Sequence, residues 1–154
     1  MLTGAEIHGR TDLRGGAVLT DSEVHGRTFL SGGTMLTDSE VHAPGSQVVR
    51  IDGDGIELRN STITGGYGVH VEDYSDNVVV AGNTIDVDGR GIRDEDDTRG
   101  VRYAGNDITA RDGILPNGRD SNGVIENNVV EAAETAIDDA SGYTIQDNTI
   151  VSGD

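Results

Sequence analysis

The chain has no cysteine, lysine or tryptophan in its 154 residues, and its aromatic rings apart from histidine are one phenylalanine and four tyrosines. The absence of cysteine excludes disulfides, thiol nucleophiles and cysteine ligands for zinc. No apolar run approaches the ~18 residues of a membrane span, and no signal peptide is visible in the sequence. We therefore expect no direct membrane insertion.

Charge of one sign dominates the sequence. It contains 28 acidic residues against 11 arginines, which gives a formal net charge of -17. Such a chain repels nucleic acid, so we expect no nucleic-acid partner. The lysine-free, carboxylate-rich composition resembles that of proteins from extreme halophiles, in which molar salt screens the repulsion between carboxylates to a few ångströms. This composition predicts a high-salt environment.

A seven-residue segment is repeated near the start of the chain. LTDSEVH occupies 19–25 and again 36–42, and the close copy LTGAEIH occupies 2–8, so this part has a period of 17 residues. Further along the chain, apolar positions recur every 20 to 23 residues, at Ile63, Ile85, Ile108, Val130 and Ile150. A recurring period of this length indicates a repeat architecture.

Within each repeat, apolar and polar residues alternate over short runs such as VHVED, NVVVAG and GVIEN. This alternation is typical of β-strands. Several short strands per repeat predict one turn of a parallel β-helix, in which coils stack about 4.8 Å apart and bury their apolar sides. We predict an all-β, single-stranded solenoid of about seven coils. It forms one domain over 1–154, with 17-residue coils over 2–50 and coils of about 22 residues over 51–154.

An asparagine precedes the apolar position by two residues in four of the longer repeats. Asparagine tolerates the positive φ that a bend between strands often requires, and its side-chain amide can bond to the same amide one coil away. We therefore predict a structural ladder, with a ligand-contacting row as the alternative. The members are Asn83, Asn106, Asn128 and Asn148.

Two segments, GVHVEDYSDNVVVAGNTIDVDGRGI and GYTIQDNTI, resemble the right-handed parallel β-helix repeat family. That family includes pectate-lyase-like proteins, NosD-type proteins and phage tailspikes. The resemblance covers residues 51–154 and implies a right-handed β-helix; it is specific for the fold and not for an activity. The coils over 2–50 are similar to bactofilin repeats in their period and their use of glycine.

The short coils are expected to present polar rows on their outer surface, because residues flanking an inward-pointing residue of a strand point outward. Imidazoles about 4.8 Å apart can converge on a transition metal, so His8, His25 and His42 are candidate metal ligands. The pattern forces no carboxylate close to this row. A solvated face, or a contact surface for another copy, is the alternative interpretation. The neighbouring rows are Glu6, Glu23 and Glu40 on one side and Arg10 and Arg27 on the other.

The acidic loop RDEDDTRG offers the residue types that pectate-lyase-type elimination uses. Asp94, Asp96 and Asp97 are candidate ligands for Ca²⁺, which prefers oxygen donors, and Asp96 is also a candidate catalytic residue. The pair Asp138 and Asp139 supplies two more catalytic candidates, by resemblance to polygalacturonase-type β-helices. The terminal Arg-Ile-Lys motif of those enzymes has no counterpart here, because the chain lacks lysine.

We expect no required cofactor, and loose binding of Ca²⁺ or other cations by acidic loops. The first coil begins in register with the repeat and no capping element is evident at either end. Bare strand edges template further pairing. We therefore expect partners to be other copies of the chain, or flanking domains, bound through the ends and the lateral faces.

The leading hypothesis is a non-catalytic structural β-helix rod of a halophile, as a subunit or fragment of a filament, a surface spike or a virion appendage. It favours an extracellular or virion-surface location, with a cytoplasmic filament as the alternative. Two other hypotheses remain open: a polysaccharide-active enzyme (lyase, hydrolase or epimerase) of pectate-lyase-like type, and a spike that binds host glycans.

Overall fold

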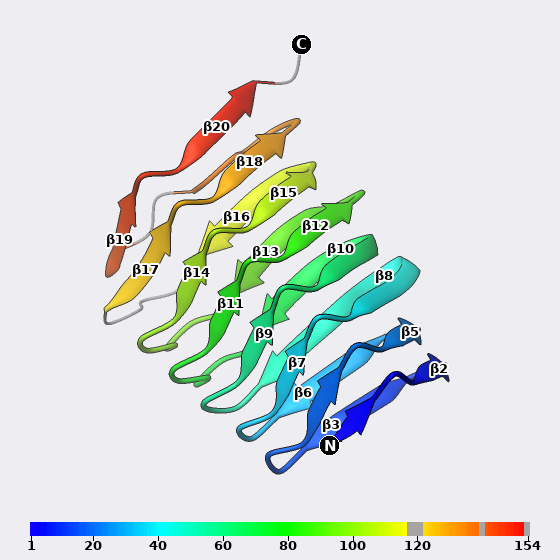
Figure 1. Cartoon of the computed structure of the whole chain (residues 1–154). Coiled ribbons are helices and arrows are strands. Elements are labelled where there is room, and N and C mark those ends of the chain that lie inside the picture. The colour runs from blue at the N-terminus through cyan, green and yellow to red at the C-terminus, as the bar shows by residue number, and fades with distance from the viewer. Residues whose placement is uncertain (117–121, 139–140, 153–154) are drawn as a thin grey trace.

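The computed structural model is a stack of short parallel β-strands (Figure 1) and describes residues 1–116, 122–138 and 141–152. Each strand pairs with the equivalent strand one coil away. Neighbouring strands in a sheet are therefore two or three strands apart in the sequence for most pairs. The prediction of an all-β parallel solenoid is therefore confirmed. In the described ranges, no helix has the length and apolar character needed to cross a membrane.

The first sheet forms one face of the solenoid and has eight strands in the part of the chain that the structure describes. This number differs slightly from the predicted count of about seven coils. In stacking order the strands are β1 (Leu2–Thr3), β4 (Val18–Thr20), β7 (Met35–Thr37), β9 (Glu57–Arg59), β11 (Val79–Ala81), β14 (Arg102–Ala104), β17 (Gly123–Glu126) and β19 (Tyr143–Gln146).

The second sheet has twelve strands and covers two faces. Its second face stacks β2 (Glu6–His8), β5 (Glu23–His25), the start of β8 (Glu40–Asp52), the start of β10 (Thr62–Val71), β12 (Thr84–Val87), β15 (Asp107–Ala110), β18 (Val129–Ala132) and β20 (Thr149–Ser152). The third face stacks β3 (Thr11–Arg14), β6 (Thr28–Ser31), the ends of β8 and β10, β13 (Arg90–Asp94) and β16 (Asp112–Pro116).

The corner between the second and third faces is where the coils lengthen. His25 pairs with His42, 17 residues later, whereas Thr28 in the next strand pairs with Val49, 21 residues later. The inserted residues lie in the middle of β8, around Pro44. One more residue enters before the first face, where Met35 pairs with Glu57, 22 residues later. Because the insertions lie between strands or at the corner within β8, the paired segments on each face keep their register with the coil below.

Equivalent apolar residues stack on one another inside the solenoid. Leu19 pairs with Leu36, and Leu36 pairs with Leu58; all three side chains are fully buried. Burial of a leucine contributes about 1.5–3 kcal/mol, and no single coil could enclose these side chains without its neighbours. The aligned apolar rows therefore hold the coils together.

The asparagines form a buried ladder at the turn between the first and second faces. Asn83 donates from Nδ2 to Oδ1 of Asn106 at 3.0 Å, and Asn106 donates to Asn128 at 3.0 Å. Asn128 in turn donates to Asn148 at 2.9 Å. Each amide also donates to a backbone carbonyl, for example Asn106 to Val80 at 2.9 Å. The ladder thus gives hydrogen-bond partners both to the asparagine amides and to backbone groups that are buried at the bend.

Serine continues this ladder through the short coils. Ser22 accepts a bond from the backbone N–H of Ala5, Ser39 accepts one from Ser22, and Ser61 accepts one from Ser39. The Ser61 N–H then donates to Oδ1 of Asn83 at 2.9 Å, which joins the two parts. The serine of the repeated LTDSEVH segment is therefore a structural acceptor, and the preceding Asp21 supplies the bend with a φ of 50°.

Replacing Asn106 by alanine should destabilise the protein by about 2–4 kcal/mol, because buried partners such as Val80 O and the Asn83 N–H lose their bonds. Urea unfolding in molar KCl measures the change. The control is Thr109→Ala, an exposed position in β15, the strand that follows Asn106, which should change stability by no more than about 0.5 kcal/mol. Equal effects of the two substitutions would show that the ladder contributes no stability.

Candidate functional site

The exposed side of the second face carries a cluster of two histidines and a glutamate. Residues two apart on a strand point to the same side of a sheet, so Glu6 and His8 of β2 lie on one surface. The parallel register then places His25 of β5 directly beside His8. Three residues from two adjacent coils therefore share one small area of surface.

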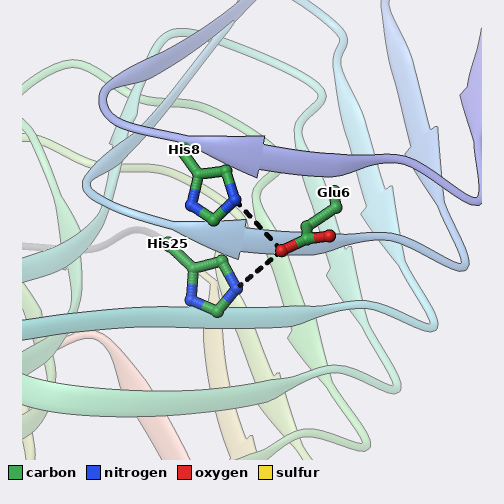
Figure 2. Close-up of side chains that lie close together, drawn as sticks. All are labelled: Glu6, His8 and His25. Carbon is green, nitrogen blue, oxygen red and sulfur yellow. Dashed lines mark ion pairs between the residues drawn. The ribbon is translucent and has the colours of Figure 1, made fainter.

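The two imidazoles face a single carboxylate (Figure 2). Glu6 Oε1 lies 3.0 Å from His8 Nε2 and 3.8 Å from His25 Nε2. The rings are stacked, with centroids 4.9 Å apart and planes 10° from parallel. Glu23 adds a second carboxylate, 2.8 Å from His25 Nε2. The ligand atoms of Glu6, His8 and His25 all lie within 4.8 Å of one another, a spacing that could hold a metal ion.

The third histidine of the predicted row is engaged elsewhere. His42 pairs in register with His25 on one side and with Thr64 on the other. Its Nδ1 lies 2.8 Å from the Thr64 hydroxyl. The structure therefore brings together two of the three predicted histidines, and it adds Glu6, which the sequence analysis had assigned to a separate row. The signal for Glu6 was its two-residue spacing from His8.

The arginine row surrounds the phenylalanine of the chain. The guanidinium carbons of Arg10, Arg27 and Arg50 lie 4.1, 5.3 and 6.0 Å from the centre of the Phe29 ring. Cation–π contacts at such distances contribute about 0.5–1 kcal/mol each at exposed sites. Sequence reasoning identified the stacked Arg10 and Arg27 but missed the ring, which β6 places on the outer surface in register with Arg50.

The predicted calcium cluster is divided between the core and the surface. Asp94 is fully buried at the end of β13 and accepts a hydrogen bond from the Tyr103 hydroxyl at 2.9 Å. The Tyr143 hydroxyl donates to the same carboxylate oxygen. Asp96 and Asp97 are exposed in the turn that follows. The structure therefore does not bring the three carboxylates together.

The register explains why Asp94 points inward. It occupies the position of Val71 in the coil below, a fully buried core site, and the paired tyrosines replace the apolar neighbours that a valine would need. Of the other two catalytic candidates, Asp138 is exposed just after the third face, and Asp139 lies outside the described residues.

A shallow groove on the third face was not anticipated from the sequence. Its volume is about 220 Å³, and Tyr67, 46% exposed, contributes an aromatic ring. His70 Nε2 lies 2.8 Å from Glu95 Oε1, and the same carboxylate pairs with Arg93 at 3.2 Å. The groove is lined by Gln47, Tyr67, Gly68, Val69, His70, Arg90 and Arg93.

Asp94→Ala should destabilise the protein by about 2–4 kcal/mol, because two tyrosine hydroxyls in or near the core lose their acceptor. Asp96→Ala, two residues away on the surface, should change stability by no more than about 0.5 kcal/mol. Urea unfolding of both variants in molar KCl without calcium makes the comparison. A similar loss in the two variants would contradict the assignment of Asp94 to the core.

Comparison with known proteins identifies the family of the chain. The family described as right handed beta helix region matches residues 12–154, which covers most of the stack from β3 onward. No curated protein and no solved structure gives a significant match. The parallel solenoid and the family match agree with each other. The chain therefore belongs to the right-handed parallel β-helix family.

Proposed function

We propose that the chain is a non-catalytic structural β-helix rod of a halophile, acting as a subunit or fragment of a filament, a surface spike or a virion appendage. The observation that carries the proposal is the in-register repetition of whole surface rows. Glu6, Glu23 and Glu40 stack on one another. The same outward glutamate recurs on three successive coils before Thr62 follows it. A surface that presents one contact several times suits a scaffold better than a reaction that needs a single site.

The placement of the candidate catalytic carboxylates supports this proposal. Asp94 serves as a hydrogen-bond acceptor for Tyr103 and Tyr143 in the interior. Asp96 is exposed in the turn beyond it. A lyase-type calcium site needs several oxygen ligands around one ion, and the inward direction of Asp94 separates it from the carboxylates with which it would share that ion.

The partners of such a rod are other copies of the chain or flanking domains that contact its lateral faces. The arginines around Phe29 give one lateral patch cationic groups, of which Arg10 and Arg50 also pair with Asp12 and Glu72. The glutamate row gives another patch a negative charge. Complementary patches on one molecule favour contact between copies. The expected location is extracellular or on a virion surface, with a cytoplasmic filament as the alternative.

Self-association in molar salt tests the rod hypothesis. We expect light scattering to give a mass above that of one chain, growing with protein concentration, and electron microscopy to show rods or fibres. Arg10→Glu, which reverses charge in the arginine patch, should reduce the association, whereas the exposed Thr109→Ala should leave it unchanged. A strictly monomeric solution over the whole concentration range would contradict the proposal.

The halophilic origin predicts a strong dependence of stability on salt. With a net charge of -17, repulsion destabilises the folded chain in dilute buffer, and molar salt shortens the screening length to about 3 Å. The melting temperature should therefore rise steadily with KCl concentration. The triple variant Asp86→Asn, Asp107→Asn, Glu131→Gln removes three exposed charges and should show a weaker rise. A melting temperature independent of salt would count against this origin.

Glycan binding is the second candidate, because the groove on the third face combines an exposed tyrosine with hydrogen-bonding and cationic groups. Tyr67 offers a ring on which a sugar can stack, and Arg90 and Arg93 offer donors to a carboxylated polysaccharide. This arrangement fits either a glycan-binding spike or a polysaccharide-active enzyme.

A panel of acidic polysaccharides, tested with and without Ca²⁺ in molar salt, distinguishes these functions. Binding without products supports a glycan-binding spike, and unsaturated or reducing products lost in Asp96→Ala or Asp138→Ala support an enzyme. Tyr67→Ala should weaken binding at least tenfold, whereas Tyr74→Asn, at an exposed tyrosine with a φ of 60° that asparagine tolerates, should not. Absence of binding and of products removes the second candidate.

A further inference from the structure

We propose that Glu6, His8 and His25 form a binding site for a divalent transition-metal ion, with Zn²⁺, Ni²⁺ or Cu²⁺ as the class of ligand. The inference goes beyond the proposed scaffold role, and it stands on the geometry of this cluster whether or not the chain assembles. The proposed ligands belong to the first two coils of the glutamate and histidine rows. The calcium-type sites considered above involve different residues and a different kind of ion.

The ligand atoms already lie near the spacing that such an ion requires. Tetrahedral zinc with bonds of about 2.0–2.1 Å separates its ligand atoms by about 3.4 Å. The distances from Glu6 Oε1 to His8 Nε2 and His25 Nε2 are 3.0 and 3.8 Å, on either side of this value. All three ligand atoms lie within 4.8 Å of one another, so side-chain rotations toward a common centre would bring them around one ion.

The backbone holds the ligands in place before any ion binds. Glu6 and His8 are fixed two residues apart on β2, and the parallel register holds His25 beside His8. Both rings present the same nitrogen, Nε2, to the same oxygen (Figure 2). Without an ion, each Nε2 donates its proton to a glutamate carboxylate. A metal ion at this position would replace that proton between the nitrogen and the oxygen, and Nδ1 would then be the protonated nitrogen of each ring. Because both Nε2 atoms approach the same carboxylate oxygen, one cation placed between them could be bound by all three atoms.

The surroundings favour a cation. Glu23 lies 2.8 Å from His25 Nε2 and can serve as an alternative carboxylate ligand from the next coil. Glu6 and Glu23 also line a hollow of about 420 Å³ together with Asp21, Asp38 and Glu40. This concentration of negative charge raises the local concentration of cations. The exposed side of the cluster leaves the remaining coordination positions to water.

The donor set selects the class of metal. Imidazole nitrogens suit zinc, copper and nickel, whereas calcium and magnesium prefer sites made of oxygen ligands alone. We therefore expect Zn²⁺ to bind here and Ca²⁺ to ignore the histidines. The chain has no cysteine, so thiolate ligands do not compete for the same ion elsewhere in the chain.

The chain itself supplies a matched control. His42 belongs to the same row and sits in register one coil beyond His25, but its Nδ1 is bonded to the Thr64 hydroxyl. A histidine in the same sequence context, and exposed on the same face, therefore lies outside the proposed site. Any effect of surface histidines in general would appear equally at His42.

Isothermal titration of the full chain with Zn²⁺ in molar potassium nitrate tests the proposal, because nitrate screens the carboxylates without competing for the ion as chloride does. Wild-type protein should bind one ion with the highest affinity. His8→Ala, His25→Ala and Glu6→Gln should each weaken that binding by about 10–100-fold or more, and His42→Ala should leave it unchanged. Titration with Ca²⁺ should give the same weak binding in wild type and in His25→Ala.

A second readout keeps the test independent of variant folding. In wild-type protein, the diamagnetic ion Zn²⁺ should shift the imidazole ¹⁵N NMR signals of His8 and His25, and leave those of His42 and His70 nearly unchanged. Equal loss of Zn²⁺ affinity in His25→Ala and His42→Ala would overturn the site in favour of diffuse binding along the row. Absence of saturable Zn²⁺ binding, or Zn²⁺-induced ¹⁵N shifts of equal size at all four histidines, would overturn it as well.

Discussion

The structure depends on one interaction above all others: the parallel, in-register hydrogen bonding of each coil to the next. It fixes which residue lies above which, so equivalent residues of successive coils form rows. Burial and surface charge are therefore shared along each row. Leu19 meets Leu36, and Glu23 meets Glu40, because the backbone pairs them. Rows of apolar residues become the core, rows of polar residues become flat surfaces, and a row of small polar residues becomes a ladder at the bend.

The ladder shows how one constraint is met by two kinds of side chain. The bend between the first and second faces needs an acceptor for a buried backbone N–H in each coil. Ser39 meets this need in the short coils: its hydroxyl oxygen accepts from the Ser22 N–H, and its hydroxyl donates back to a carbonyl within the same turn. Asn106 meets it in the longer coils: its Oδ1 accepts from the Asn83 N–H, and its Nδ2 also donates to the Asn128 amide. The amide spans two coils, so the longer coils are bound to each other more extensively at this corner.

The same stacking decides where chemistry can occur. Two histidines can cooperate only if the register places them side by side, as it does for His8 and His25. The row stops contributing where the next coil presents Thr64 instead. Likewise, the side chain of Asp94 points inward from its strand position and not toward the rest of the acidic loop. In the interior it accepts hydrogen bonds from the Tyr103 and Tyr143 hydroxyls. The repeat therefore sets where side chains can cooperate, and a change in the repeat, as at Thr64, sets where a row ends.

The sequence by itself determined the solenoid, because a repeat period and a two-residue alternation leave little choice but stacked parallel strands. It also identified the asparagine row, since Asn83 and Asn106 recur at the coil spacing. Several features of the site were implicit in the same pattern: the two-residue step from Glu6 to His8, and the alignment of Asp94 with Val71. The spacing alone does not say which outward side chains touch, or that an acidic residue occupies a core position.

Only the tertiary structure decided how the side chains in each row are oriented and which faces meet at a corner. The distances from Glu6 to both imidazoles depend on side-chain rotations that no period specifies. The groove beside Tyr67 depends on the register of the third face, where strands from different coils bring His70 and Arg93 together. A repeat fixes position along the rod and inward or outward direction, whereas contacts between neighbouring side chains depend on packing in three dimensions.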